Sequence, residues 1–148
     1  MLELWTDGSC KNNGKKDSSG GWAFVIVRDK QIIDKRYGSQ KNTTNNQMEM
    51  MAVIEALKYA NLNADFDEKI QVYSDSAYVV NCFLQKWYIK WKNNNWVGVK
   101  NPELWKEMLS LYECFGENIE FIKVKGHKGI INNEFCDMLA KKGSEEAK

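Results

Sequence analysis

Two short stretches of the sequence place an aspartate and a small residue directly after a run of strand-forming residues. The first is LWTDGS, in which Gly8 follows Asp7, and the second is VYSDS, in which Ser76 follows Asp75. Either stretch alone is ordinary turn chemistry. If the two strands are parallel neighbours, however, their carboxyl ends meet at one edge of a sheet and the two carboxylates converge.

A helix predicted over residues 46–61 brings a third candidate carboxylate. At about 100° per residue, Glu49 lies about 80° from the centre of the apolar stripe and leans toward the sheet, whereas Glu55 lies about 160° away and faces water. Glu49 is also in the first helical turn, where the helix dipole favours a negative charge. Glu49 is therefore either a third acid of one site or a residue that compensates the dipole.

The last predicted helix contains a fourth carboxylate, Asp137. Its apolar side is formed by Phe135, Cys136 and Leu139, and periodicity places Asp137 on the opposite side together with Asn133. By this pattern alone, Asp137 is an ordinary solvent-exposed residue.

Carboxylates gathered in one place repel one another and resist ionisation unless a cation lies among them. Ligands that are all oxygen suit Mg²⁺ or Mn²⁺ rather than zinc. Two such ions about 3.5–4 Å apart can activate a water molecule and stabilise the leaving oxygen in phosphodiester cleavage. Each acid also has a plain structural explanation, so the pattern leaves a shared metal site and four unrelated residues as alternatives.

His127 is the single histidine of the chain, and it lies between Gly126 and Gly129 after a predicted strand at residues 119–125. It is either an incidental exposed residue or, if this strand runs parallel to the one before Asp75, a group that transfers protons beside the carboxylates.

Tryptophans and lysines alternate in the segment KWYIKWKNNNW. Trp87 and Trp91 are at helical spacing, which predicts burial against a neighbouring helix. Aromatic faces beside lysines such as Lys90 also suit nucleotide sugars and phosphates, and Trp96 extends the same segment. The net charge of only +1 argues against a protein that coats nucleic acid indiscriminately, and we interpret each single lysine cluster as a solvated face.

The elements that must position these residues follow from hydrophobic periodicity and turn signals. The predicted strands are residues 2–7, 20–29, 31–40, 69–74 and 119–125. The predicted helices are residues 46–61, 77–91 with a break near Gln85, 101–115 with Asn101 as the capping side chain, and 132–142. A hairpin followed by strands that are joined through helices predicts a mixed α/β sheet covered by helices.

Length and composition predict one compact domain spanning residues 1–148. With 43% hydrophobic residues the chain can fill a real core, and we expect neither a membrane span nor a secretory signal. Its 4 cysteines are scattered without a CxxC pair, which favours free thiols and a cytoplasmic location. We expect a complete, standalone protein that acts as a monomer without a membrane partner.

Six motifs, in order along nearly the whole chain, closely resemble type 1 ribonuclease H. They are TDGS at 6–9, TTNNQMEMMAVIEAL at 43–57, YSDSAYVV at 73–80, WYIKWKNNNW at 87–96, VKGHKG at 124–129 and NNEFCDMLA at 132–140. The resemblance implies the ribonuclease H-like α/β fold: a five-stranded mixed sheet in the order 3-2-1-4-5, with strand 2 antiparallel and helices on its faces.

The resemblance also implies an activity, cleavage of the RNA strand of an RNA/DNA hybrid to 3′-hydroxyl and 5′-phosphate ends with Mg²⁺ or Mn²⁺. It implies that the metal ligands and catalytic acids are Asp7, Glu49, Asp75 and Asp137. His127 is implied to assist proton movement and product release. The residues implied to contact the hybrid are Asn13, Thr44, Asn45 and Asn46, together with Trp87, Lys90, Trp91 and Trp96 of a DNA-gripping protrusion at residues 86–100.

Two other hypotheses remain within the same resemblance. The chain could be the ribonuclease H domain of a retroelement polyprotein, or a hybrid-binding module with little catalysis, although such a module would be expected to have lost an acid. The loop at residues 11–19 is longer than in many relatives, and Gln47 stands where others have arginine. We therefore expect hybrid binding that is weaker or more salt-sensitive than in a strongly basic relative.

Overall fold

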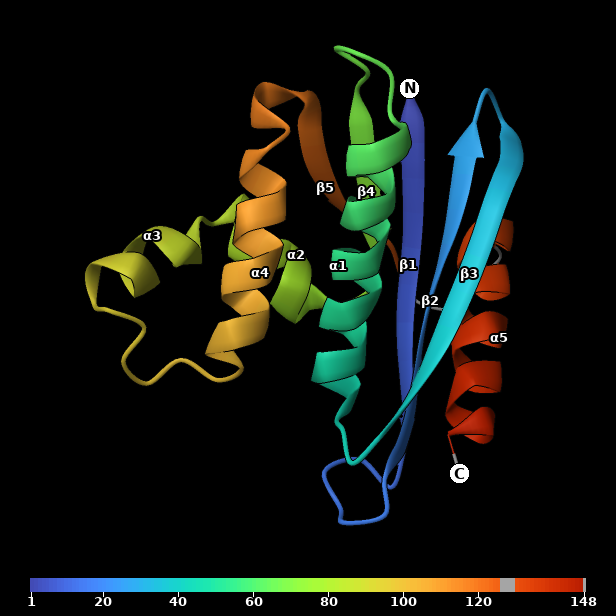
Figure 1. Cartoon of the computed structure of the whole chain (residues 1–148), viewed down its shortest axis with the longest axis vertical. Helices are drawn as coiled ribbons and strands as arrows, with labels where there is room; N and C mark the ends of the chain where they lie inside the picture. The colour runs from blue at the N-terminus through green and yellow to red at the C-terminus, as the bar shows by residue number, and fades with distance from the viewer. Residues whose placement is uncertain (126–129, 148) are drawn as a thin grey trace.

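The computed structural model describes residues 1–125 and 130–147, which form a sheet flanked by helices (Figure 1). The strands are β1 (Leu2–Lys11), β2 (Ser19–Arg28), β3 (Gln31–Lys41), β4 (Ile70–Ser74) and β5 (Ile119–Lys123). The helices are α1 (Asn45–Asn63), α2 (Ala77–Leu84), α3 (Trp87–Asn93), α4 (Pro102–Glu113) and α5 (Ile131–Glu146), with a 3-10 turn at Gly116–Asn118.

The five strands lie in the order β3-β2-β1-β4-β5. Strand β2 is antiparallel to both β1 and β3, whereas β4 is parallel to both β1 and β5. The predicted fold class, strand order and antiparallel second strand are therefore confirmed. The parallel neighbours β1 and β4 are the strands that carry the two aspartates of the opening motifs.

Strand β1 is longer than predicted. It continues to Lys11 because its second half pairs with β2, from Asp7 opposite Ala23 to Lys11 opposite Ser19. Only its pairing with β4 stops early, at Trp5 opposite Tyr73. The expectation that Asp7 ends a strand is therefore wrong, and Gly8 needs another explanation than a turn.

Two hydrophobic clusters hold the layers together, one on each face of the sheet. Successive residues of a strand point to opposite faces, so Leu4 packs with α1 and α4, whereas Trp5 faces α5. Helices α1 and α4 cover one face, and α5 lies behind β2 and β3 on the other (Figure 1). Asp7 thus lies in a strand that is buried from both sides.

Helix α5 packs very closely on the hairpin of β2 and β3. A side chain at Gly21 would collide with the backbone of α5 at Ala140, and one at Gly143 would collide with the Gly38 carbonyl of β3. Helix and sheet can approach this closely only because these positions have no Cβ.

The predicted break in the helix at residues 77–91 is confirmed, since α2 ends at Leu84 and α3 begins at Trp87. Lys86 between them has a left-handed backbone with φ 56°. Asn101 occupies the capping position of α4, but it makes no side-chain cap hydrogen bond. The prediction of a capping side chain is therefore wrong, and the Asn101 amide is used elsewhere.

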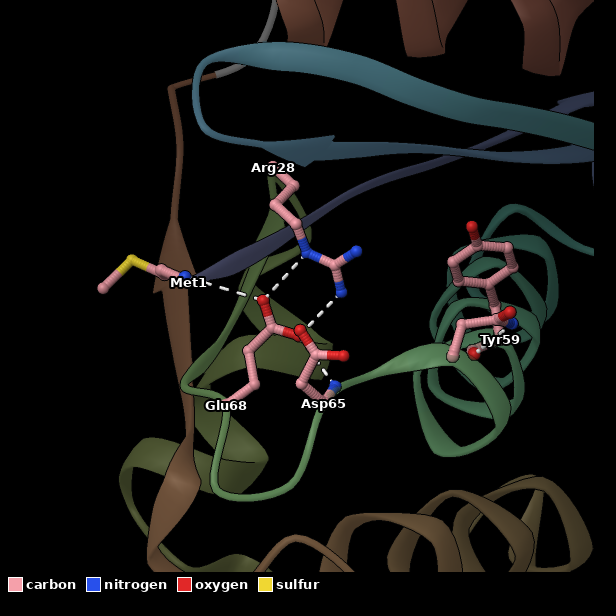
Figure 2. A network of polar contacts seen from close by, with 6 residues as sticks. Met1, Arg28, Tyr59, Asp65 and Glu68 are labelled. Atoms are coloured by element: carbon pink, nitrogen blue, oxygen red, sulfur yellow. Dashed lines mark hydrogen bonds and ion pairs between the residues drawn. The ribbon is translucent and has the colours of Figure 1, made fainter.

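A buried carboxylate, Glu68, ties together the end of the sheet at which β1 begins (Figure 2). The Arg28 guanidinium donates to both its oxygens, at 2.7 and 3.0 Å, and the Asp65 N–H donates at 2.9 Å. The amino group of Met1 lies 3.6 Å away. The hydrogen bonds from Arg28 lower the pKa of Glu68 to about 2. This network holds the first residue of β1 against the segment that leads into β4.

The cysteines agree with the prediction of free thiols, since all four are free. Cys82 and Cys136 are buried in the core, while Cys10 and Cys114 reach the surface. Among the helices of the described residues, none is both long enough and apolar enough to cross a membrane.

Candidate active site

Three of the four predicted acids converge. Asp7 comes from the middle of β1, Glu49 from the beginning of α1, and Asp75 from the residue after β4. One carboxylate oxygen of each lies within 4.8 Å of the other two. The parallel pairing of β1 and β4 and the packing of α1 on β1 bring together residues that are far apart in the sequence.

Helix α1 approaches β1 so closely at Gly8 that there is no room for a side chain. A Cβ at Gly8 would lie 2.9 Å from the Cα of Glu49 and still closer to the backbone around Met48. The Gly8 N–H donates to Glu49 Oε1 at 2.7 Å and to Asp7 Oδ1 at 2.9 Å. The glycine after Asp7 therefore admits the helix and orients two of the three acids.

Asp75 is positioned by hydroxyl groups on both sides of the strand end. The buried Thr6 hydroxyl donates to the Tyr73 carbonyl at 2.9 Å, which extends the link between β1 and β4 beyond their last paired residues. After the strand, Ser74 Oγ accepts from the Ser76 N–H at 3.1 Å, and the Ser76 hydroxyl caps α2. These bonds fix the spacing between Asp7 and Asp75.

The acids lie in surroundings that oppose their charge. Asp7 is 2% exposed, and burial, together with the charges of Asp75 and Asp137, raises its pKa to about 8. Burial and the neighbouring Asp7 likewise raise the pKa of Glu49 well above its ordinary value. Asp7 Oδ2 and Glu49 Oε2 are buried without a hydrogen-bond partner among the described residues. Buried carboxylate oxygens of this kind suit a divalent cation.

Asp137 is not the exposed residue that periodicity indicated. Its side chain is 16% exposed and forms an ion pair with Lys141 at 3.1 Å, and its charge helps to raise the pKa of Asp7. Asn133, predicted on the same exposed side, is only 1% exposed. The covered side of α5 is wider than its apolar stripe because β1, β2 and β3 all pack against it. Asp137 thus adjoins the three converging acids through Asp7, although it is not one of the three.

His127 lies in residues 126–129, outside the part of the chain that the structure describes, so its role stays a prediction. The described chain leads toward it from β5, which is parallel to β4, and the Val124 N–H donates to the Ser74 carbonyl at 2.9 Å.

Two adjoining hollows run from the loop after β1 along the start of α1 to α3. The first, of about 650 Å³, is lined by the predicted contact residues Asn13, Thr44, Asn45 and Asn46, with Gly14, Lys100 and Asn101. The second, of about 590 Å³, is lined by Asn46, Tyr78, Lys90, Trp91, Asn94, Val97, Gly98, Val99, Lys100 and Asn101. The shared residues Asn46, Lys100 and Asn101 join the hollows into one groove, called here the amide groove.

Two predicted contact residues also have structural roles. Asn13 Oδ1 accepts from the Asn45 N–H at 2.9 Å, which ties the β1–β2 loop to α1. Thr44 caps α1, since its hydroxyl accepts from the Gln47 N–H at 3.1 Å. The side chains of Asn45 and Asn46, by contrast, are exposed at the beginning of the helix.

The tryptophans form a half-buried cluster on α4. Trp91 stands 5.2 Å from Trp105 between ring centroids, and Trp87 and Trp96 each lie 6.1 Å from Trp91. Trp91 packs against Trp105 of α4 as predicted, but it is only partly buried. Of the three predicted tryptophans only Trp91 lines the amide groove, while Trp96 faces Lys106 at 5.8 Å.

Asn101 was not predicted as a groove residue, whereas Lys100 is the last residue of the predicted protrusion. The Asn-Pro-Glu stretch was interpreted only as a helix start, and a capping position carries no sequence signal for a second role. Only the fold reveals it, by bringing the start of α4 beside the first turn of α1.

Comparisons with known proteins agree with this geometry. A family model described as RNase H matches residues 1–145. A protein of Thermoanaerobacter sp. (strain X514) named ribonuclease H is 41% identical over 145 residues, which cover 95% of this chain and 87% of that one. Among solved structures, LC9-RNase H1, titled a type 1 RNase H with the type 2 active-site motif, has a TM-score of 0.81 at 25% identity and covers 99% of this chain and 73% of its own. LC11-RNase H1 in complex with an RNA/DNA hybrid shares the fold, with a TM-score of 0.72, 22% identity and 99% of both chains covered.

Proposed function

The chain belongs to the ribonuclease H family, and we propose that it hydrolyses the RNA strand of RNA/DNA hybrids in a metal-dependent reaction. The products would carry 3′-hydroxyl and 5′-phosphate ends. The observation that carries the proposal is the convergence of Asp7, Glu49 and Asp75 within 4.8 Å. A carboxylate cluster with a purely structural role would have its buried oxygens paired, whereas within the described chain one oxygen each of Asp7 and Glu49 has no partner.

The ligand set fits Mg²⁺, with Mn²⁺ as the alternative, because every donor is a carboxylate oxygen. When bound, two such ions would supply an activated water and stabilise the leaving oxygen. Asp7, Glu49 and Asp75 would hold the ions, and the Gly8 N–H keeps Glu49 turned toward Asp7. We assign Asp137 as a fourth ligand on the resemblance of its motif, and because it is near enough to Asp7 for its charge to raise the pKa of that carboxyl. We also assign proton transfer to His127, on the resemblance of its motif alone.

The amide groove suits the backbone of a hybrid. Asn45 and Asn46 begin α1 and precede Glu49 by only four and three residues, so a strand held by their amides passes close to the acids. RNA displays its 2′-hydroxyls in a wide, shallow minor groove, which short amide side chains can reach. Lys90, Trp91 and Lys100, on the other side of the groove, suit the phosphates and sugars of the second strand. The related LC11-RNase H1, solved with an RNA/DNA hybrid, supports this substrate.

One cleavage experiment tests the proposal. The purified protein, which we propose is active as a monomer, is incubated with Mg²⁺ and labelled RNA/DNA hybrid, double-stranded RNA, single-stranded RNA or double-stranded DNA. We expect cleavage of the RNA strand of the hybrid alone. Asp75→Asn should abolish turnover and keep the fold, whereas the matched change Asp67→Asn, in the loop before β4, should leave turnover unchanged. Binding of the hybrid without cleavage by the unaltered protein would refute the proposal and indicate a binding module.

A further inference from the structure

A chain of hydrogen bonds runs beneath the amide groove from the β1–β2 loop to the start of α4. Ser18 Oγ donates to the Thr43 carbonyl at 2.9 Å and accepts from the Thr43 N–H at 2.8 Å. Thr43 Oγ1 donates to Gln47 Oε1 at 2.8 Å, and Gln47 Nε2 donates to Asn101 Oδ1 at 3.0 Å. Ser18 and Thr43 are each 2% exposed, so the first half of this chain is buried.

One wall of the amide groove is the start of α1 and another is the start of α4, and Gln47 connects the two. Its own N–H bonds to the Thr44 hydroxyl in the first turn of α1, and its side chain reaches Asn101 at the start of α4. Asn101 lines both hollows of the groove. The contact between Gln47 and Asn101 is thus a direct side-chain link between the α1 wall and the α4 wall.

The direction of these bonds decides what Asn101 presents to the groove. The Thr43 hydroxyl donates to Gln47 Oε1, so the NH₂ group of Gln47 is turned toward Asn101, which accepts with Oδ1. An amide whose oxygen is engaged on one side presents its NH₂ group on the other. The sugar-phosphate backbone offers mainly oxygen acceptors, so a donor in the groove binds it and a carbonyl oxygen would repel it.

We infer that Gln47 is a positioning residue for the nucleic-acid substrate: it orients the Asn101 amide as a donor and fixes the spacing of the two groove walls. The inference rests on the proposed function, because the ligand it concerns is the backbone of the hybrid. Gln47 acts through Asn101 and not on the reacting phosphate. Its loss therefore weakens substrate binding and leaves the chemical step unchanged.

A double-mutant cycle on cleavage of the hybrid tests this. Gln47→Met keeps the length of the side chain and removes its hydrogen bonds, Asn101→Ala removes the partner, and the double variant combines both. We expect Gln47→Met to raise KM by about 3- to 10-fold, as for the loss of one or two hydrogen bonds, with kcat within about twofold of the unaltered value. In the Asn101→Ala background the same change should have no further effect on KM.

A matched control removes a different amide contact. Asn118 accepts from Lys69 Nζ at 3.0 Å, close to the beginning of β5 and among residues that do not line the groove. Asn118→Ala should leave both KM and kcat unchanged. If Gln47→Met does not fold, Thr43→Val replaces it, because removing the donor to Gln47 Oε1 should raise KM only while Asn101 is present.

If the wild-type protein cleaves the hybrid, three results would overturn the inference alone. The first is an unchanged KM in Gln47→Met, and the second is that Gln47→Met raises KM by the same factor in the Asn101→Ala background as in the wild type. The third is that Gln47→Met lowers kcat at constant KM. The last would place the effect at Glu49, two residues away in α1. Failure of the wild-type protein to cleave the hybrid would instead refute the proposed function, and the inference with it.

Discussion

Replacing Asp7 with asparagine should make the metal-free protein more stable while it abolishes hydrolysis. Asp7 is 2% exposed, and its burial, together with the charges of Asp75 and Asp137, raises its pKa to about 8 from an ordinary value of 3.8. Between these pH values the folded protein holds a proton that the unfolded chain releases. The free energy of unfolding of the metal-free wild type therefore falls as the pH rises from about 4 to about 8.

The magnitude follows from the size of the shift. Each pH unit over which the folded state holds one extra proton lowers the stability by about 1.4 kcal/mol, which sets a ceiling of roughly 4 kcal/mol at pH 7. Asp75 and Asp137 are partly exposed, which weakens their effect on Asp7, so we expect about 2 kcal/mol. Asparagine has nearly the same shape and no charge to lose, so Asp7→Asn should remove the part of this pH dependence that is due to Asp7.

Urea unfolding followed by circular dichroism, with a chelator present, measures the effect at pH 4, 5.5, 7 and 8 (chosen to span the titration). The stability difference between Asp7→Asn and the wild type should be near zero at pH 4 and grow to about 2 kcal/mol at pH 7. Asp17→Asn, in the exposed β1–β2 loop, serves as the control and should show no such trend. A difference that is equal at every pH, or an Asp7→Asn protein that is less stable at pH 8, would refute the electrostatic account of the site.

Other consequences of the structure can be measured in the same way. Mg²⁺ should raise the urea midpoint of the wild type more at pH 8 than at pH 5, because the ion displaces a proton held by the acids; equal shifts at both values would contradict this. Gly8→Ala should destabilise the protein by about 1–3 kcal/mol and weaken this Mg²⁺ effect, since a Cβ at that position meets the α1 backbone; an unchanged midpoint and Mg²⁺ response would argue against the close approach. Glu68→Gln should lower stability by about 1–3 kcal/mol at pH 7. Because the folded pKa of Glu68 is about 2 against an ordinary 4.5, its contribution is present above pH 4.5 and is lost as the pH falls toward 2. Thermal melts of the wild type and of Glu68→Gln at pH 7 and pH 3 test this. A difference in melting temperature that is larger at pH 3 than at pH 7 would refute it.

Local sequence patterns correctly predicted the positions of residues that depend on a single helix or strand. The angle of Glu49 on its helix could be read from periodicity because Glu49 lies on the side of α1 that packs on the sheet, and the buried Glu49 confirms that reading. The position of Asp75 followed from a strand that ends at a turn, as β4 does. The break after α2 was also readable, and it coincides with the left-handed Lys86.

Residues that depend on distant neighbours were less predictable. Strand β1 runs past Asp7 because β2 pairs with its second half, and no pattern inside β1 records that partner. Asp137 was predicted as exposed because periodicity counts only apolar residues, whereas the covered side of α5 also includes Asn133. Only the resemblance to ribonuclease H selected Asp137. The link between Gln47 and Asn101 joins two helices that are far apart in the sequence, so no single-helix pattern could indicate it.

The parallel pairing of β1 with β4 also bears on when the acids first meet during folding. The Thr6 hydroxyl and the Tyr73 carbonyl that it contacts are separated by 67 positions in the chain. Contacts of such high sequence separation require closure of a long loop, and chains dominated by them tend to fold slowly. A fragment or an intermediate that contains only the three strands β1, β2 and β3 and helix α1 would bring Asp7 to Glu49 but would lack Asp75. Affinity for divalent ions would therefore report that the native topology is complete, and it should appear in a refolding reaction only after the two central strands have joined.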